Sequence, residues 1–246
     1  MTEKLSNDEL SKRCRFFDEN YEETKEKVEK AAAASGRKVK DIVLLAATKT
    51  VPVEVINHAI SKGLTHVGEN RVQELLSKYD ELHKDNVSVQ FIGRLQTNKV
   101  RQVVGKVSLI QSLDSRRLAE EIARQSQKQN RITDVLVEVN IGREENKSGV
   151  FPENTVDFLQ EITEICGIKV RGLMAVPPIC EKKEEVRSYF SQMTKLFIDI
   201  KDKKLDNASM DYLSMGMSSD YEEAILEGAN MVRIGQSLFG ARNYNK

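Results

Sequence analysis

The chain has 246 residues, which is enough for one large domain or two small ones and for a sizeable hydrophobic core. Lysine plus arginine and aspartate plus glutamate each total 38, so the formal net charge is zero and no basic excess points to nucleic acid or to an anionic membrane surface. The three cysteines are too scattered to form a complete disulfide framework or a zinc site. The N-terminus lacks the apolar core of a signal peptide, and no apolar run reaches the length of a membrane span. These features predict a cytoplasmic protein.

Residues 1–38 are predicted to contribute a helix that precedes the first strand. Apolar and small side chains recur there at alternating spacings of four and three, which places them along one face of a helix. They are Leu10, Cys14, Phe17, Tyr21, Thr24, Val28 and Ala31. A partner helix in a coiled coil could cover such a stripe, but only about three heptads are present. We therefore expect the helix to pack on the outside of the domain that follows it.

Short β-branched and apolar runs alternate with charged helical runs along the rest of the chain. The predicted strands are 42–49, 65–69, 87–93, 108–114, 134–140, 168–176, 212–218 and 231–236. The predicted helices include 53–62, 71–83, 115–129, 153–166 and 221–227. Such alternation predicts right-handed βαβ units and a parallel sheet. Eight units in this length indicate a (β/α)8 TIM-type barrel, with a doubly wound open sheet as the alternative. No linker marks a second domain, so we expect a single domain over residues 1–246.

The first predicted strand ends on a lysine, Lys49, in the stretch "LLAATKTVP". Side chains alternate along a strand, so Lys49 shares a face with Val43, Leu45 and Ala47. Ligands of parallel α/β proteins bind at this end of the strands. If that face is the barrel interior, burial would lower the pKa of Lys49, and its neutral amine could form a Schiff base with an aldehyde. The alternative is a lysine that extends to the rim and pairs with a carboxylate.

The last two predicted strands end in serines and glycines. In "LSMGMSSD" the hydroxyls of Ser214, Ser218 and Ser219 precede a helix, an arrangement that can bind an anion. In "VRIGQSLFGAR" the backbone amides of Gly235 and Gln236 could point at a phosphate. Barrels often bind phosphate with the loops that follow strands seven and eight. These residues are also ordinary turn and capping residues, but two such segments on neighbouring strands favour a phosphate site.

Three further residues stand at strand ends with two interpretations each. Arg233 shares the face of Gly235 and needs a polar partner there, either a ligand or a structural ion pair. Asn70 is either a helix N-cap or an amide that contacts a ligand. Met174 is either a core residue or part of a ligand-binding wall. The three histidines have no metal-ligand spacing, and we predict neither a metal site nor catalysis by them.

With these residues in view, the chain resembles the pyridoxal phosphate homeostasis proteins, whose barrel is similar to the N-terminal domain of alanine racemase. The resemblance covers nearly the whole chain after residue 40. The motifs that carry it are "ATKTVP", "GENRVQE", "FIGRLQTNK", "NKSG", "GLMAVPP", "SMGMSSD" and "VRIGQSLFGAR". Small departures stand at Thr48, Gln90 and Arg94, and Arg94 at the barrel mouth could alter what reaches a cofactor.

The resemblance implies that pyridoxal 5′-phosphate (PLP) is the cofactor and that Lys49 holds it as a Schiff base. It implies that Ser214, with the backbone at Gly235 and Gln236, holds the phosphate, that Arg233 faces the pyridine nitrogen, and that Asn70 lies near the ring. The expected cofactor-binding residues are Lys49, Asn70, Met174, Ser214, Met215, Arg233, Gly235 and Gln236. A carboxylate beside the ring nitrogen keeps that nitrogen protonated, which makes the ring a strong electron acceptor. An arginine cannot accept that proton, so the ring nitrogen should stay neutral and the ring should withdraw electrons poorly.

The resemblance therefore implies a PLP-binding homeostasis protein with little or no catalysis of its own, and we expect it to be no enzyme in the ordinary sense. PLP-dependent apoenzymes are the candidate partners, and a monomer is expected. The alternative is an amino-acid racemase of low activity. Racemisation needs a second acid or base opposite the lysine, and the β-domain that supplies it in alanine racemase is not expected here. A Schiff-base aldolase also fits the fold but lacks an evident carboxylate–lysine proton relay.

Overall fold

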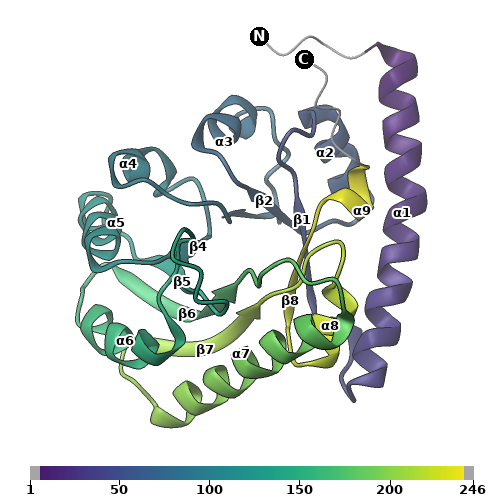
Figure 1. Cartoon of the computed structure of the whole chain (residues 1–246). Helices are drawn as coiled ribbons and strands as arrows, with labels where there is room; N and C mark the ends of the chain where they lie inside the picture. The colour runs from purple at the N-terminus through teal and green to yellow at the C-terminus, as the bar shows by residue number, and fades with distance from the viewer. Residues whose placement is uncertain (1–5, 241–246) are drawn as a thin grey trace.

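The computed structural model describes residues 6–240 and forms a closed barrel of eight parallel strands in chain order (Figure 1). The strands are β1 (Val43–Ala47), β2 (His66–Glu69), β3 (Ser88–Phe91), β4 (Leu109–Leu113), β5 (Thr133–Val139), β6 (Ile168–Ala175), β7 (Ala208–Ser214) and β8 (Met231–Ile234). The pairing of β1 with β8 closes the barrel. The predicted (β/α)8 barrel is confirmed, and the open-sheet alternative is wrong.

Helices surround the barrel; α2 to α8 each connect two consecutive strands, whereas α1 precedes β1 and α9 follows β8 (Figure 1). They are α1 (Asn7–Ala34), α2 (Val53–Ser61), α3 (Val72–Tyr79), α4 (Val100–Val103), α5 (Arg116–Lys128), α6 (Thr155–Thr163), α7 (Lys183–Lys203), α8 (Tyr221–Leu226) and α9 (Gln236–Phe239). Within the described residues, none of these helices combines the length and the apolar character needed to cross a membrane. The three cysteines are free thiols.

Strand β7 is the one whose predicted position is clearly displaced. The sequence predicts it over 212–218, but it begins at Ala208 and ends at Ser214. Gly216 has a positive φ of 93°, and the backbone amide of Met217 donates to Asp220 Oδ1 over 2.7 Å. These features turn the chain out of the sheet, so "GMSSD" forms the loop after the strand.

The alternation of side chains divides the apolar residues between two cores. The larger core lies between the outside of the barrel and the helices. The smaller core fills the barrel itself and contains Leu45, Leu109, Leu136, Met174 and Met231. Leu45 therefore confirms that the face of β1 that precedes Lys49 is the barrel interior.

Helix α1 covers one side of the barrel, against α2, α8 and α9 (Figure 1). Ser6 caps it by accepting a hydrogen bond from the amide of Glu9. Phe17 is fully buried and stacks on Tyr21 and on Phe239 of α9, with ring centroids 5.1 and 5.3 Å apart. Residues Asn7–Ala34 therefore lie against helices of the same chain.

Candidate functional site

Lys49 follows β1 at the mouth of the barrel, beside the end of β8. The two strands pair in register, with Leu45 opposite Arg233 and Ala46 opposite Ile234. The next interior position of β8 is Gly235, where a Cβ atom would lie 3.2 Å from the backbone oxygen of Ala47. The absence of a side chain at Gly235 therefore lets the ends of β1 and β8 approach closely.

Arg233 lies inside the barrel, with 5% of its surface exposed. Its Nη1 donates to Ser214 Oγ over 2.6 Å, and its Nη2 donates to the backbone oxygen of Ala175 over 2.9 Å. Burial lowers the pKa of Arg233 to about 10, while the nearby carboxylates of Glu138 and Asp220 act in the opposite direction. The guanidinium therefore keeps its charge at neutral pH, although Ser214 Oγ and the backbone oxygen of Ala175, which accept its hydrogen bonds, are neutral.

A chain of polar side chains crosses the barrel from Arg233. Ser214 Oγ donates to Gln111 Oε1 over 2.7 Å, and Gln111 Nε2 donates to Gln90 Oε1 over 2.6 Å. Gln90 Nε2 donates in turn to Ser88 Oγ over 3.0 Å. The hydroxyl of Ser214 thus accepts from Arg233 and donates its one hydrogen to Gln111, so a hydrogen bond from Ser214 to a phosphate oxygen would require the bond to Gln111 to break.

The loop after β7 meets the loop after β8 through Ser218. Its Oγ accepts hydrogen bonds from the backbone amides of Gly235 and Ser237, each over 3.2 Å. Ser237 Oγ donates to the backbone oxygen of Ser218 over 3.3 Å. Two backbone amides therefore converge on one oxygen atom at the end of β8, where the sequence predicts a phosphate site.

Asn70 follows β2 and holds a buried oxygen atom. Among the described residues, Asn70 Oδ1 has no hydrogen-bond partner. The N-cap of α3 is Arg71, so the interpretation of Asn70 as the helix cap is wrong. An unsatisfied buried acceptor at the carboxyl end of a barrel strand is suited to a polar ligand group.

The two methionines of the predicted site lie on opposite faces of the sheet. Met174 belongs to the core inside the barrel and is almost fully buried. Met215 packs in the core between barrel and helices, so only its backbone can contribute to a site inside the barrel mouth. Gln236 is exposed and begins α9.

A pocket of about 330 Å³ opens on the other side of the mouth, at the ends of β5 and β6. Arg94, Lys147 and Glu138 are its charged lining residues. Glu138 Oε1 accepts from Ser148 Oγ over 3.0 Å. Burial raises the pKa of Glu138, whereas Arg233 and Arg94 act in the opposite direction.

Sequence reasoning missed Glu138 and Ser237. The signal for Glu138 was its position two residues after Leu136, on the same face of a predicted strand. The signal for Ser237 was only its nearness to Gly235, since its contact with Ser218 depends on two loops that are distant in sequence.

Comparison with known proteins identifies the family of the chain. The family profile described as "Alanine racemase, N-terminal domain" matches residues 18–243. The chain is 48% identical over 219 residues to the pyridoxal phosphate homeostasis protein of Aquifex aeolicus, covering 89% of this chain and 95% of that protein. It is 36% identical over 232 residues to the protein of the same name from Escherichia coli K12, covering 92% and 97%.

The chain belongs to the pyridoxal phosphate homeostasis protein family.

Solved structures similar to this family member include two bacterial proteins. One is a protein of Bifidobacterium adolescentis, with a TM-score of 0.90 at 32% identity over 97% of this chain and 98% of that chain. The other is PipY of Synechococcus elongatus with PLP bound, with a TM-score of 0.75 at 30% identity over 87% and 100%. Alanine racemase of Clostridium difficile has a TM-score of 0.69 at 14% identity, and the aligned region covers 58% of its chain, so that likeness shows the fold alone.

Proposed function

We propose that this protein binds PLP at the mouth of its barrel, serves intracellular PLP homeostasis, and uses Lys49 as the residue of covalent attachment. The observation that carries the proposal is the register of β1 with β8, which brings Lys49, Arg233 and Gly235 to one side of the mouth. The names of the relatives and the PLP-bound PipY structure support the same cofactor.

The chemistry of the residues around the mouth fits PLP. Lys49 supplies a primary amine, and the amides of Gly235 and Ser237 supply donors for a phosphate in the position of the Ser218 hydroxyl. Asn70 Oδ1 supplies an acceptor without a partner among the described residues. When bound, PLP supplies an aldehyde that combines with amines and a ring that withdraws electrons.

Arg233 favours a binding role over catalysis. A guanidinium has only donors and keeps its proton at neutral pH, so Arg233 can donate a hydrogen bond to the ring nitrogen. It cannot stabilise the protonated form of that nitrogen, as the carboxylate of many PLP enzymes does. We propose that the electron withdrawal which PLP enzymes depend on is therefore weak, and that the protein has little or no catalytic cycle of its own.

The positions of the tyrosines disfavour a racemase. Tyr212 packs against the core inside the barrel, and Tyr221 is buried on the outside, in α8. Tyr244 lies outside the described residues. Neither Tyr212 nor Tyr221 stands at the mouth, where a second proton-transferring group would face Lys49.

Substitution of Lys49 by alanine tests the proposal. Purified protein would be incubated with PLP and treated with borohydride, which makes an attachment through a lysine amine permanent. We expect Lys49→Ala to lose the yellow colour and the permanent adduct while it retains some PLP through the phosphate contacts. Lys183→Ala, on the outer helix α7, is the matched control and should keep both. A Lys49→Ala protein with wild-type colour and adduct would contradict the proposal.

We further propose that PLP-dependent apoenzymes receive the cofactor from this protein in the cytoplasm and that the protein is a monomer. Analytical ultracentrifugation with and without PLP tests the oligomeric state. Transfer to a purified apoenzyme, measured as recovered enzyme activity, tests the recipient, and a rate no faster than that of free PLP at the same concentration would count against a dedicated transfer.

A further inference from the structure

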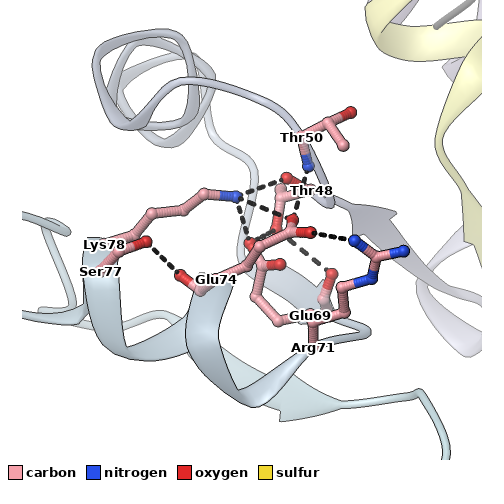
Figure 2. A network of polar contacts seen from close by, with 8 residues as sticks. Thr48, Thr50, Glu69, Arg71, Glu74, Ser77 and Lys78 are labelled. Carbon is pink, nitrogen blue, oxygen red and sulfur yellow. Dashed lines mark hydrogen bonds and ion pairs between the residues drawn. The ribbon is translucent and has the colours of Figure 1, made fainter. Parts of the chain in front are cut away.

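A cluster of charged side chains lies beside the end of β1 (Figure 2), next to a small cavity whose apolar lining belongs to the core between the barrel and the helices. Glu69 comes from the end of β2, and Glu74 and Lys78 come from α3. The cluster contacts Thr48 and Thr50, the two neighbours of Lys49 in the chain. None of these three charged residues belongs to the predicted cofactor site.

Lys78 is the centre of the cluster. Its Nζ lies 2.8 Å from Glu69 Oε1 and 3.8 Å from Glu74 Oε2, and it donates to the backbone oxygen of Thr48 over 2.9 Å (Figure 2). The side chains of Lys78 and Glu69 are only 15% and 5% exposed. A single partly buried ammonium therefore joins the end of β1 to β2 and to α3.

Both neighbours of Lys49 are fixed by carboxylates. Thr48 Oγ1 donates to Glu69 Oε1 over 2.8 Å, and the backbone amide of Thr50 donates to Glu74 Oε2 over 2.7 Å. Thr50 has a positive φ of 64°, which a β-branched residue rarely adopts. Such a conformation persists only where surrounding contacts determine it, and the hydrogen bond that the Thr50 amide donates to Glu74 is such a contact.

The cluster is poorly explained by stability alone. Well-packed apolar side chains often stabilise a fold as much as a buried ion pair does. Among the described residues, Glu69 Oε2 is buried without a hydrogen-bond partner, which is an unfavourable state for a carboxylate. The adjoining cavity measures about 10 Å³, the lower limit of the space that one water molecule needs, so solvent gives it little relief.

We infer that Glu69, Glu74 and Lys78 are positioning residues, which fix the turn at Thr48 and Thr50 and thereby the direction in which Lys49 leaves the backbone. The inference rests on the proposed function of Lys49 as the attachment residue. It assigns the three residues no contact with the cofactor. Their effect passes through the backbone on both sides of Lys49.

Two measurements test this inference, one with PLP and one without it. The first is the rate at which added PLP becomes attached, followed by absorbance. The second is the rate at which formaldehyde and cyanoborohydride methylate Lys49 in ligand-free protein, followed by mass spectrometry of the Lys49 peptide. The methylation rate depends on the position and surroundings of the Lys49 amine and does not require that PLP binds.

Glu74→Ala is the principal variant because Glu74 is partly exposed and alanine suits a helix, so this variant should fold. A misplacement of about 1 Å can slow a reaction on the order of 100-fold, and we expect Glu74→Ala to slow PLP attachment by about 10-fold to 100-fold. Glu74→Gln keeps an oxygen that can accept from Thr50 and should recover most of the rate. Lys78→Met should have an effect at least as large as that of Glu74→Ala.

Arg171→Met is the control for a general loss of stability. Arg171 pairs with Asp134 and Asp211 over 2.7 and 2.6 Å, in strands β5 to β7 and away from Lys49. It should leave both rates unchanged even where it lowers the melting temperature. Wild-type rates in folded Glu74→Ala would overturn the inference. If wild-type protein takes up no PLP, the proposed function fails, and the methylation rates alone then decide whether Glu74 positions Lys49.

Discussion

At the scale of single residues, the buried charge of Arg233 has the most direct chemical consequence. Its hydrogen bonds go to two neutral acceptors, Ser214 Oγ and the backbone oxygen of Ala175. The nearby carboxylates of Glu138 and Asp220 favour its charged form. A guanidinium in this position can donate to a ring nitrogen without protonating it. The arginine therefore sets the electronic state of any heteroaromatic ring that it meets.

Arg233→Glu should favour a protonated ring nitrogen, because a carboxylate stabilises the pyridinium form. We expect a shifted visible band and weaker PLP binding, since the new carboxylate would also lie near Glu138. Absorbance spectra and a PLP titration measure both effects, with Arg233→Lys as the variant that keeps the positive charge. An unchanged spectrum together with an unchanged affinity in folded Arg233→Glu would put the placement of the ring in doubt.

The buried carboxyl group of Glu69 should make the stability of the fold depend on pH. Burial raises the pKa of Glu69 above its ordinary value of 4.5, and Lys78 and Thr48 oppose this only in part. The folded protein therefore binds the proton more tightly than the unfolded chain does. The resulting stabilisation is complete below about pH 4.5 and is lost as the pH rises through the folded-state pKa. The free energy of unfolding falls over this range by about 1.4 kcal/mol for each pH unit by which folding raises the pKa.

Glu69→Gln should remove this dependence, so the difference in unfolding free energy between variant and wild type should move in favour of the variant as the pH rises from 4.5. Urea unfolding at several pH values measures it. A difference that is constant with pH would show that Glu69 has the same pKa in the folded and unfolded states.

At the scale of elements, α1 supports the end of the barrel that carries the proposed phosphate site. Phe17 stacks on Phe239 of α9, and α9 begins directly after Gly235. Neighbouring Phe16 is 45% exposed, whereas Phe17 is fully buried. Comparing substitutions at these two adjacent phenylalanines therefore distinguishes the loss of packing from a change in helical propensity.

Phe17→Ala should cost about 3–5 kcal/mol of stability, as expected for a fully buried phenylalanine. Phe16→Ala should change stability by no more than about 0.5 kcal/mol. We also expect Phe17→Ala to weaken PLP binding, because Phe239 of α9 loses its stacking partner on α1. Chemical unfolding and a PLP titration of both variants measure these effects. Equal losses in the two variants would contradict the role given to Phe17.

The sequence predicts elements better than it predicts contacts between them. The alternation of apolar, β-branched runs with charged helical runs located all eight strands, and only β7 was clearly displaced, because the positive φ of Gly216 ends it early. Lys49 and Arg233 could be brought together only through the assumption that the barrel closes, which the β1–β8 register confirms. The contacts of Ser218 with Ser237 and of Glu69 with Lys78 depend on side-chain positions that periodicity does not carry.

At the scale of the whole molecule, closure of the barrel creates the candidate site from the two ends of the chain. Lys49 follows the first strand, Arg233 belongs to the last strand and Gly235 directly follows it, while a pocket of about 330 Å³ opens at β5 and β6 beside Glu138. A barrel with one anchored amine and an open side suits a protein that holds a reactive aldehyde and releases it again.

The central claim is that Lys49 is the residue that holds PLP, and one measurement tests it most directly. The wild-type protein would be saturated with PLP, reduced with borohydride, digested, and mapped by mass spectrometry. The account predicts loss of the visible band on reduction and a pyridoxyl adduct that lies predominantly on Lys49. An adduct on another lysine, or no adduct after PLP has been added, would contradict it.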